Sequence, residues 1–569
     1  MLRLSAPLIL CAALAAQTSA QPAPNRFVPA DSFLVVRTAA PAKWKQRFAK
    51  TQMAKLFQSP SLEPMLAQVS KALDEGIERI RTTGKLDADL IQSLVRDYAG
   101  DITVAMQLDW DDLAAAMAEN RPPAVSMIVT LSPDGAFDLA SVAAAVEKAV
   151  DQSAENRRPM KDLSVGDVRL RITADADTVQ ASVPAIVDGQ LVMLFANDLE
   201  HAAPKMLAAE KRFDGAIGEK ALYAHAHLAP AVSAFLAAID EQAGAMIPFD
   251  LSQVFSDLGL SALDSGTLSI DATDKRTLVE MEVNLGSGDP GLFGALLVEA
   301  QPKMMRLVPA NAEAFNVSHL DIGAIYSVVA KVWEQFGDQI PMTMEDAESA
   351  FADACKVRLK EDLLAHLGQE IVSLQSDDAV DPDEEEAPTN ILATSCFAVA
   401  LKDAKAFGQS LETLLRSRGM HAARKTEEYA DQKIHRLRVA GLLEVEYAVT
   451  DDALLLVIGK NEGSSRNLRA ILDAKKQGGE GPAILQKVVA DAPAGWTGVS
   501  VSPVSGLFST VKQIMKQAAR NDQDARTQVI NTIAGMLDAV VADAKQLGIE
   551  HAVSTTYATP RSLRTQIRL

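Results

Sequence analysis

Cysteine, aromatic residues and long apolar runs are all scarce in this chain. Its 569 residues include 3 cysteines, 4 tryptophans and 6 tyrosines. So few aromatic side chains make a poor stacking platform for sugars or nucleic-acid bases. After the first twenty residues no run approaches the roughly 18 uninterrupted apolar residues that a membrane-spanning helix needs. We therefore predict no transmembrane segment.

Positive charge is also in deficit. Lysine and arginine number 55 against 75 aspartate and glutamate residues, which gives a net charge of −20. The phosphates of nucleic acids and of anionic lipid surfaces both attract proteins rich in Lys and Arg. We therefore predict no nucleic-acid partner. The hydrophobic content of 48% and charged content of 23% are ordinary for a folded globular chain.

The signatures of common enzymes are missing as well. The chain has no G-x-S-x-G elbow, H-E-x-x-H, C-x-x-C, P-loop or dinucleotide fingerprint. Ser509 and Lys512 have the S-x-x-K spacing of serine acyl-transferring enzymes, but the companion S-D-N and K-T-G motifs are absent. We predict that the protein is not an enzyme, with no catalytic residue and no cofactor. A site assembled from scattered residues is the enzymatic alternative.

The first twenty residues have the pattern of a secretory signal peptide. Arg3 supplies the positive charge, Leu8–Ala16 is a short apolar run, and small residues up to Ala20 form a cleavage site. Lipidation at Cys11 is an alternative, but Leu10 is a large residue where lipidation signals have a small one. We predict cleavage after residue 20 and a periplasmic or secreted protein.

Two long stretches of the chain carry the same order of signals. AVSMIVTLSPDGAFDLASVAAAVEKAV from Ala124 is echoed by ATSCFAVALKDAKAFGQSLETLLRSRG from Ala393, and FVPA from Phe27 by LVPA from Leu307. The offset between matching segments stays near 260 to 290 residues along the chain, and similarity at such a long offset indicates a duplicated structural unit. The predicted organisation is a signal peptide over 1–20, repeat unit 1 over 21–290 and repeat unit 2 over 300–569.

Each unit combines strands of alternating polarity with amphipathic helices. Val125–Leu131 and Ser395–Leu401 are predicted to be equivalent strands, and Leu443–Val449 alternates apolar and other residues with period two. Such alternation indicates an antiparallel sheet with one buried face. The predicted fold class is α+β, with two homologous repeats, each a mainly antiparallel sheet covered on one face by amphipathic helices. The sequence leaves open whether the repeats share one sheet.

This order of elements resembles an uncharacterised family of bacterial exported proteins, a domain of unknown function, present here as a tandem duplication. Five soft patterns carry the resemblance: Val28–Asp31, Leu367–Ile371, Phe397–Leu415, Tyr447–Leu472 and Ala490–Pro503. The resemblance implies an exported protein and assigns no functional residue.

Three groups of side chains have types that can carry chemistry. Cys355 and Cys396 are either a disulfide, if the compartment is oxidising, or two small buried hydrophobes. The acidic stretch 377–386 offers carboxylates to calcium but lacks the spacing of an EF-hand, which favours a solvated loop. His225 and His227 share one face of a predicted strand, as half a metal site would, but no further ligand is near in sequence. We predict no metal site.

Two functions fit these observations. We favour an exported, non-catalytic protein that binds another protein or an envelope component, because duplication enlarges a surface without requiring catalytic geometry. The alternative is a periplasmic carrier of an apolar ligand such as a lipid, held between sheet and helices. A broad exposed apolar patch would favour the first function, and a deep apolar pocket the second.

Overall fold

The structure is a computed structural model of the chain. It describes most residues from 27 to 569. The main stretches outside the described residues are 1–26, 376–394 and 506–538, with shorter breaks chiefly within 39–122 and 209–219 and at 155–159, 174–179, 244–249 and 337–341. The predicted signal peptide, the acidic stretch 377–386 and the pair Ser509 and Lys512 therefore lie outside the described residues.

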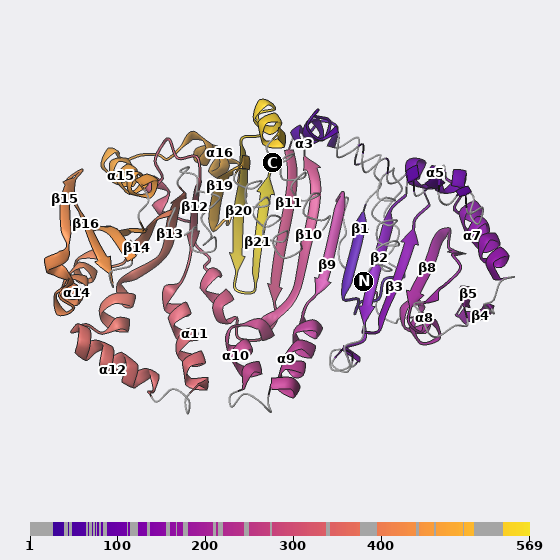
Figure 1. Ribbon diagram of the computed structural model, residues 1–569, viewed down its shortest axis with the longest axis horizontal. Coiled ribbons are helices and arrows are strands. Elements are labelled where there is room, and N and C mark those ends of the chain that lie inside the picture. Colours follow the sequence, from indigo (N-terminus) through magenta and orange to yellow (C-terminus); the bar gives the residue numbers. More distant parts are fainter. Residues whose placement is uncertain are drawn as a thin grey trace.

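One long antiparallel sheet organises the molecule (Figure 1). Its described strand pairs follow one another in a single line, and the short strands β6 (Gln180–Ala181) and β7 (Ala185–Val187) flank the last strand. In spatial order the strands are β15 (Lys425–Tyr429), β16 (Gln432–Val439), β17 (Leu443–Val449), β18 (Ala453–Ile458), β14 (Ser395–Leu401), β13 (Leu367–Gln375), β12 (Phe315–His319), β19 (Gly498–Pro503), β20 (His551–Thr559), β21 (Ser562–Arg568), β11 (Arg276–Leu285), β10 (Leu263–Thr273), β9 (Leu222–His227), β1 (Leu34–Thr38), β2 (Ile102–Leu108), β3 (Val125–Leu131) and β8 (Gln190–Ala196).

The strand order is the same on both sides of the β11–β21 pair. Outward from β11 come β10, β9, β1, β2, β3 and β8, and outward from β21 come β20, β19, β12, β13, β14 and β18. The halves meet through backbone pairing of β11 with β21, so they share one sheet.

Helices cover the two ends of this sheet and line one edge of its centre (Figure 1). Short polar side chains begin several of them; Asp403, for example, accepts a hydrogen bond from the Ala406 N–H at 2.9 Å. The helices are α3 (Gln52–Phe57), α5 (Ala88–Asp97), α7 (Leu139–Ala154), α8 (Leu199–Leu207), α9 (Ala229–Ala243), α10 (Leu251–Asp257), α11 (Ile322–Gln335), α12 (Met344–Cys355), α14 (Ala404–Ser417), α15 (Glu462–Gln477) and α16 (Ala483–Asp491). The short helices η2 (Gly291–Leu296) and η3 (Met304–Leu307) and the hairpin of β4 (Met160–Val165) with β5 (Val168–Thr173) complete the part used below.

At the β8 end, layers pack on both faces of the sheet. On one face Ile128 and Leu194 join a core with Leu199 and Met206 of α8 and Leu170 of the β4–β5 hairpin. On the other face a second core joins strands β2, β3 and β8 to α5 and α7, through residues that include Val129, Leu131, Leu139, Val142 and Leu90.

The opposite end is built in the same way. Val372 and Ala398 pack beneath α15 and α16, while Leu401 and Leu454 pack on the other face against Phe407 of α14. The prediction of helices on one face only was therefore wrong at both ends. Strands such as β3 are apolar at consecutive positions, so both of their faces need a covering layer.

Candidate functional site: the apolar face of the central strands

The four central strands β9, β10, β11 and β21 differ from the ends because one of their faces is apolar and the other is charged. Residues directly opposite each other in antiparallel strands point to the same side of a sheet. The register therefore assigns one side to a set that we call the apolar face: Leu222, Ala224, Ala226, Gly266, Leu268, Ile270, Val279, Met281, Val283, Leu563, Thr565 and Ile567.

The opposite side of the same strands, the charged face, holds Asp271, Glu280, Glu282, Arg564 and Arg568. Glu280 accepts hydrogen bonds from Lys220 and from Gln566, both at 2.6 Å, and from Arg564. Burial opposes ionisation of this carboxyl, but the three donors outweigh it and lower the pKa of Glu280 from 4.5 to about 2. The charged face is therefore internally paired where β11 meets β21.

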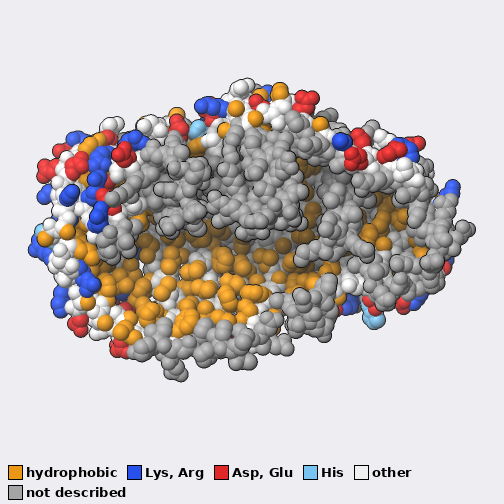
Figure 2. All heavy atoms as spheres, viewed as in Figure 1, with side chains coloured by type: hydrophobic (Ala, Val, Ile, Leu, Met, Phe, Trp, Pro, Cys, Tyr) orange, Lys and Arg blue, Asp and Glu red, His pale blue; other side chains and the backbone are white. Residues whose placement is uncertain are grey.

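The apolar face is accessible to solvent. Met281 at its centre is 42% exposed, and the other large side chains of the set are half-buried. Figure 2 shows hydrophobic side chains gathered in a hollow over the lower parts of the central strands and over the helices beneath them, with charged side chains beside its left end. The large exposed hydrophobic residues of those helices and the segments beside them are Phe235, Leu292, Leu296, Val329 and Met342.

The helices beside the hollow support one another. Phe235 of α9 meets Phe255 of α10 edge to face, with ring centroids 5.8 Å apart. In α11 the Trp333 indole donates to the Met342 carbonyl at 3.1 Å, which fixes the segment before α12. Large exposed hydrophobic residues are thus held on ordered elements. Clusters of this kind mark binding surfaces more often than isolated exposed residues do.

This surface suits an apolar partner. Removing apolar surface from water stabilises a complex by about 25 cal/mol per Å², or about 0.8 kcal/mol for each buried CH₂ group. The apolar face offers no ionisable side chain and, in Thr565, a single hydroxyl among its residues. The arrangement therefore offers apolar contacts to a binding partner.

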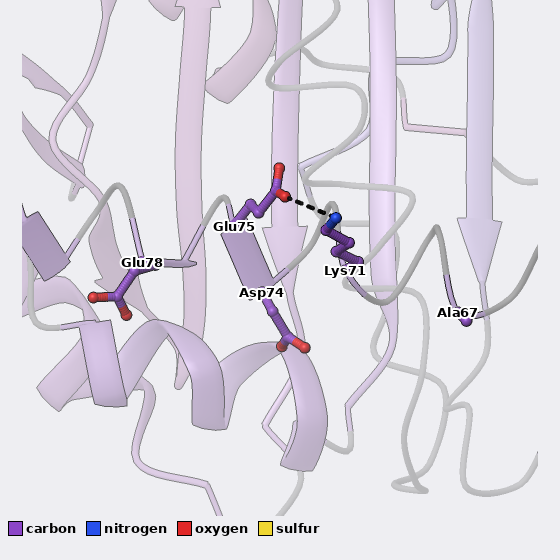
Figure 3. Close-up of a pocket in the computed structure, with 5 residues that line it drawn as sticks. All are labelled: Ala67, Lys71, Asp74, Glu75 and Glu78. Carbon is purple, nitrogen blue, oxygen red and sulfur yellow. Dashed lines mark ion pairs between the residues drawn. The ribbon is translucent and has the colours of Figure 1, made fainter.

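Two other depressions in the described part of the chain are lined in large part by charged or polar residues. The one in Figure 3 is lined by Ala67, Lys71, Asp74, Glu75 and Glu78, and its only pair drawn, Lys71 with Glu75, spans 3.9 Å between exposed side chains. A cleft of about 300 Å³ lies where the first turn of α15 meets the ends of β12 and β13, lined by residues that include Asn311, Glu313, Gln375, Arg466 and Asn467. Neither shows a convergent set of groups with an evident reaction.

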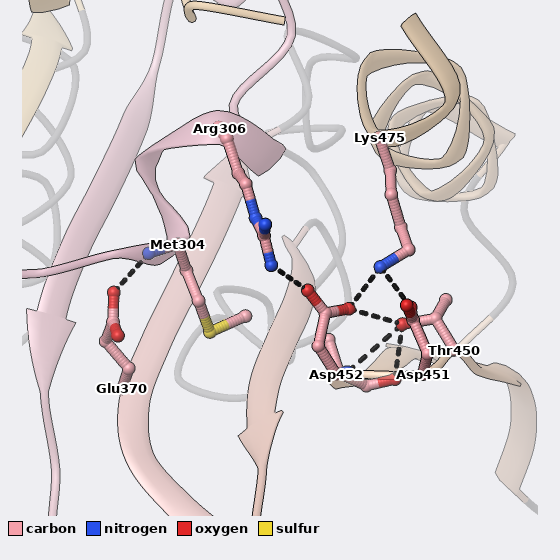
Figure 4. A network of polar contacts seen from close by, with 8 residues as sticks. Met304, Arg306, Glu370, Thr450, Asp451, Asp452 and Lys475 are labelled. Atoms are coloured by element: carbon pink, nitrogen blue, oxygen red, sulfur yellow. Dashed lines mark hydrogen bonds and ion pairs between the residues drawn. The ribbon is translucent and has the colours of Figure 1, made fainter. Parts of the chain in front are cut away.

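A network of polar contacts connects η3, the β17–β18 turn and α15 in the second half of the chain (Figure 4). We assign it a structural role. Asp452 in the β17–β18 turn binds Arg306 of η3 and Lys475 of α15, and accepts from the Thr450 hydroxyl at 3.0 Å. Burial raises the pKa of Asp452, but the Lys475 and Thr450 hydrogen bonds and both cations lower it overall. The network ties η3, the turn and α15 together over the core of this half.

The histidines and cysteines singled out by the sequence are not brought together. His225 and His227 do share the charged side of β9, where His225 packs against Phe213 with ring centroids 5.0 Å apart. No three His, Cys, Asp or Glu side chains gather into a metal-binding group within the described residues. Cys355 and Cys396 are free thiols buried in different cores, so the disulfide alternative is not what the structure shows. Burial raises the pKa of Cys396.

The alternation of apolar and charged residues in β11 and β21 is visible in the sequence, but the exposure of its apolar side is not. Alternation alone predicts that the apolar side is buried, and whether a layer covers it depends on helices far away in the chain.

No helix among the described residues is long and apolar enough to cross a membrane.

The comparisons with known proteins assign no family. No family model matches the chain, and no curated protein matches it. Among solved structures, crystal form III of TP0453 aligns with a TM-score of 0.21 at 8% identity, over 48% of this chain and 83% of that one; crystal form I gives 0.21 at 9% identity, over 48% and 81%. With TM-scores this low, these alignments carry no argument about the fold or function of this chain.

Proposed function

We propose that this chain is an exported, non-catalytic protein that binds another protein or an envelope component through the apolar face of its central strands. The observation that carries the proposal is the accessible apolar face, on which Met281 is 42% exposed, together with the hollow of hydrophobic side chains over the central strands in Figure 2. Large exposed apolar patches on folded proteins generally mark sites that bind a protein, a membrane or a ligand.

The proposal includes the organisation and the location of the protein. A signal peptide over 1–20 directs it to the periplasm or the medium, and repeat units 1 and 2 arise by duplication within an exported family. The identical strand order on the two sides of the β11–β21 pair supports the duplication. A carrier of an apolar ligand such as a lipid, the second candidate, uses the same hollow and is favoured by its apolar floor.

The test compares what co-purifies with three forms of the protein from its native envelope fraction. In Met281→Lys a charge is placed at the centre of the apolar face. Ile186→Lys is the matched control, because Ile186 is 41% exposed but lies on β7 at the far edge of the sheet. We expect a stoichiometric molecule, identified by mass spectrometry, with the wild type and the control but not with Met281→Lys. Loss in neither variant, or in both alike, would contradict the proposal.

A further inference from the structure

We propose that the occupant of the apolar face is a zwitterionic diacyl phospholipid whose two acyl chains lie side by side across the central strands. This inference rests on the proposed function and names the class of ligand that the surface takes. It concerns the ordered residues of β9, β10, β11 and β21.

The register arranges the apolar face in three rows that cross the four strands. One row is Ala226, Gly266, Val283 and Leu563; the middle row is Ala224, Leu268, Met281 and Thr565; the third is Leu222, Ile270, Val279 and Ile567. Rows lie two residues apart along each strand, which is roughly 6.8 Å. Two parallel furrows therefore run between the three rows, as two parallel chains require.

The length of the furrows also suits acyl chains. Adjacent strands are roughly 4.8 Å apart, so four strands span roughly 14 Å from the first to the last. The middle row extends onto the neighbouring strand β1, where Val36 lies opposite Ala224 on the same side of the sheet. A medium to long acyl chain in extended form covers this distance.

The chemistry of the rows distinguishes a lipid from a protein partner. A typical protein interface makes about one hydrogen bond for each 100–200 Å² and so presents polar groups within its area. Here the charged residues Asp271, Glu280 and Arg564 all point to the other side of the same strands. A methylene chain needs no hydrogen-bonding partner, and the flexible thioether of Met281 adapts to chains of different shape.

The charge of the protein selects the headgroup. A net charge of −20 repels anionic phospholipids, while a zwitterionic headgroup carries no net charge to oppose it. Charged side chains stand beside the left end of the hollow in Figure 2, and none is visible on its described floor. This arrangement places such a headgroup at that end and the acyl chains on the floor.

The experiment measures transfer of pyrene-labelled phosphatidylcholine from vesicles to the purified, delipidated full chain. Pyrene excimer emission falls as labelled lipid leaves the vesicle, and gel filtration then gives the lipid bound per protein. We expect saturable binding near one lipid per chain. We expect at least a tenfold loss of affinity in Met281→Lys and in a second variant, Leu268→Lys, with no loss in Ile186→Lys. Circular dichroism shows whether each variant is folded. The test can be read from either Met281→Lys or Leu268→Lys, provided that one of them is folded.

Single-chain lysophosphatidylcholine with the same label and anionic phosphatidylglycerol are the comparison ligands. Equal or tighter binding of the single-chain lipid would overturn the two-chain assignment, and equal binding of the anionic lipid would overturn the headgroup assignment. No binding of any lipid would overturn this inference as a whole. If a protein partner still co-purified in a manner sensitive to Met281→Lys, the proposed function would stand without it.

Discussion

Glu280 of β11 lies directly opposite Gln566 of β21, and the Gln566 amide donates to the Glu280 carboxylate at 2.6 Å. Each residue occupies the same place in its hairpin, four residues after the turn that ends at Arg276 in one half and at Ser562 in the other. The two halves therefore meet at positions that correspond to each other. A glutamine on one side avoids placing two carboxylates face to face at this junction.

Restoring the symmetry of this pair is expected to weaken the junction. In Gln566→Glu two carboxylates would lie directly opposite, and like charges in that position destabilise a strand pair by up to about 1 kcal/mol. The expected result is a lower urea midpoint at pH 7 than for Gln566→Ala, which loses the hydrogen bond without adding charge. Equal midpoints for the two variants would contradict the account.

The same carboxylate predicts a dependence of stability on pH. The folded-state pKa of Glu280 is about 2, below its usual 4.5, so the stabilisation is complete above pH 4.5 and is lost as pH falls toward 2. In Glu280→Gln this contribution is absent. The difference in unfolding free energy between wild type and variant should therefore shrink between pH 4.5 and 2. A difference that stays constant over that window would show that Glu280 does not titrate there.

Both cysteines should behave as buried thiols. Cys396 is fully buried and burial raises its pKa, so its thiolate, the reactive form, is scarce. We expect no reaction of these two thiols with Ellman's reagent in the native protein, and reaction of both Cys355 and Cys396 after unfolding. Gel mobility should be the same with and without reductant. A single disulfide in the unfolded, unreduced protein would contradict the structure.

The network around Asp452 should contribute to the stability of the second half. Asp452→Asn weakens its contacts with Arg306 and Lys475, and we expect a loss of about 1–2 kcal/mol in the free energy of unfolding. Asp451→Asn is the control, because Asp451 also contacts Lys475 but is 83% exposed; it should change stability little. Chemical denaturation measures the free energy of unfolding of both variants. Similar losses in the two would contradict the claim that the Asp452 network stabilises this half.

Local structure was predictable from the sequence where it depends on neighbouring residues. The strands Val125–Leu131 and Ser395–Leu401 have the predicted bounds, because apolar runs between turn residues define them. The α+β class and the antiparallel sheet follow from the same patterns. The joining of β11 to β21 was not predictable, since it pairs residues almost 300 positions apart, such as Glu280 and Gln566, through backbone groups that every residue has.

The candidate site was half visible in the sequence. Leu563 and Ile567 alternate with Arg564 and Arg568, which correctly separates two faces. Which face is left accessible depends on where the helices pack, and their amphipathic patterns do not say which strands they cover. Helices α5, α7, α12 and α14 pack against the two ends of the sheet. Met281, on the apolar face of the central strands, remains exposed.

The most direct test of the central claim is photocrosslinking from the apolar face in the native envelope. A photoreactive benzoylphenylalanine replaces Met281 in one form of the protein and Ile186 in another, at positions of nearly equal exposure. Our account predicts a discrete adduct, a lipid or one protein, from position 281 and none from position 186. Equal labelling from both positions, or labelling from 186 alone, would show that the apolar face of the central strands is not the binding surface.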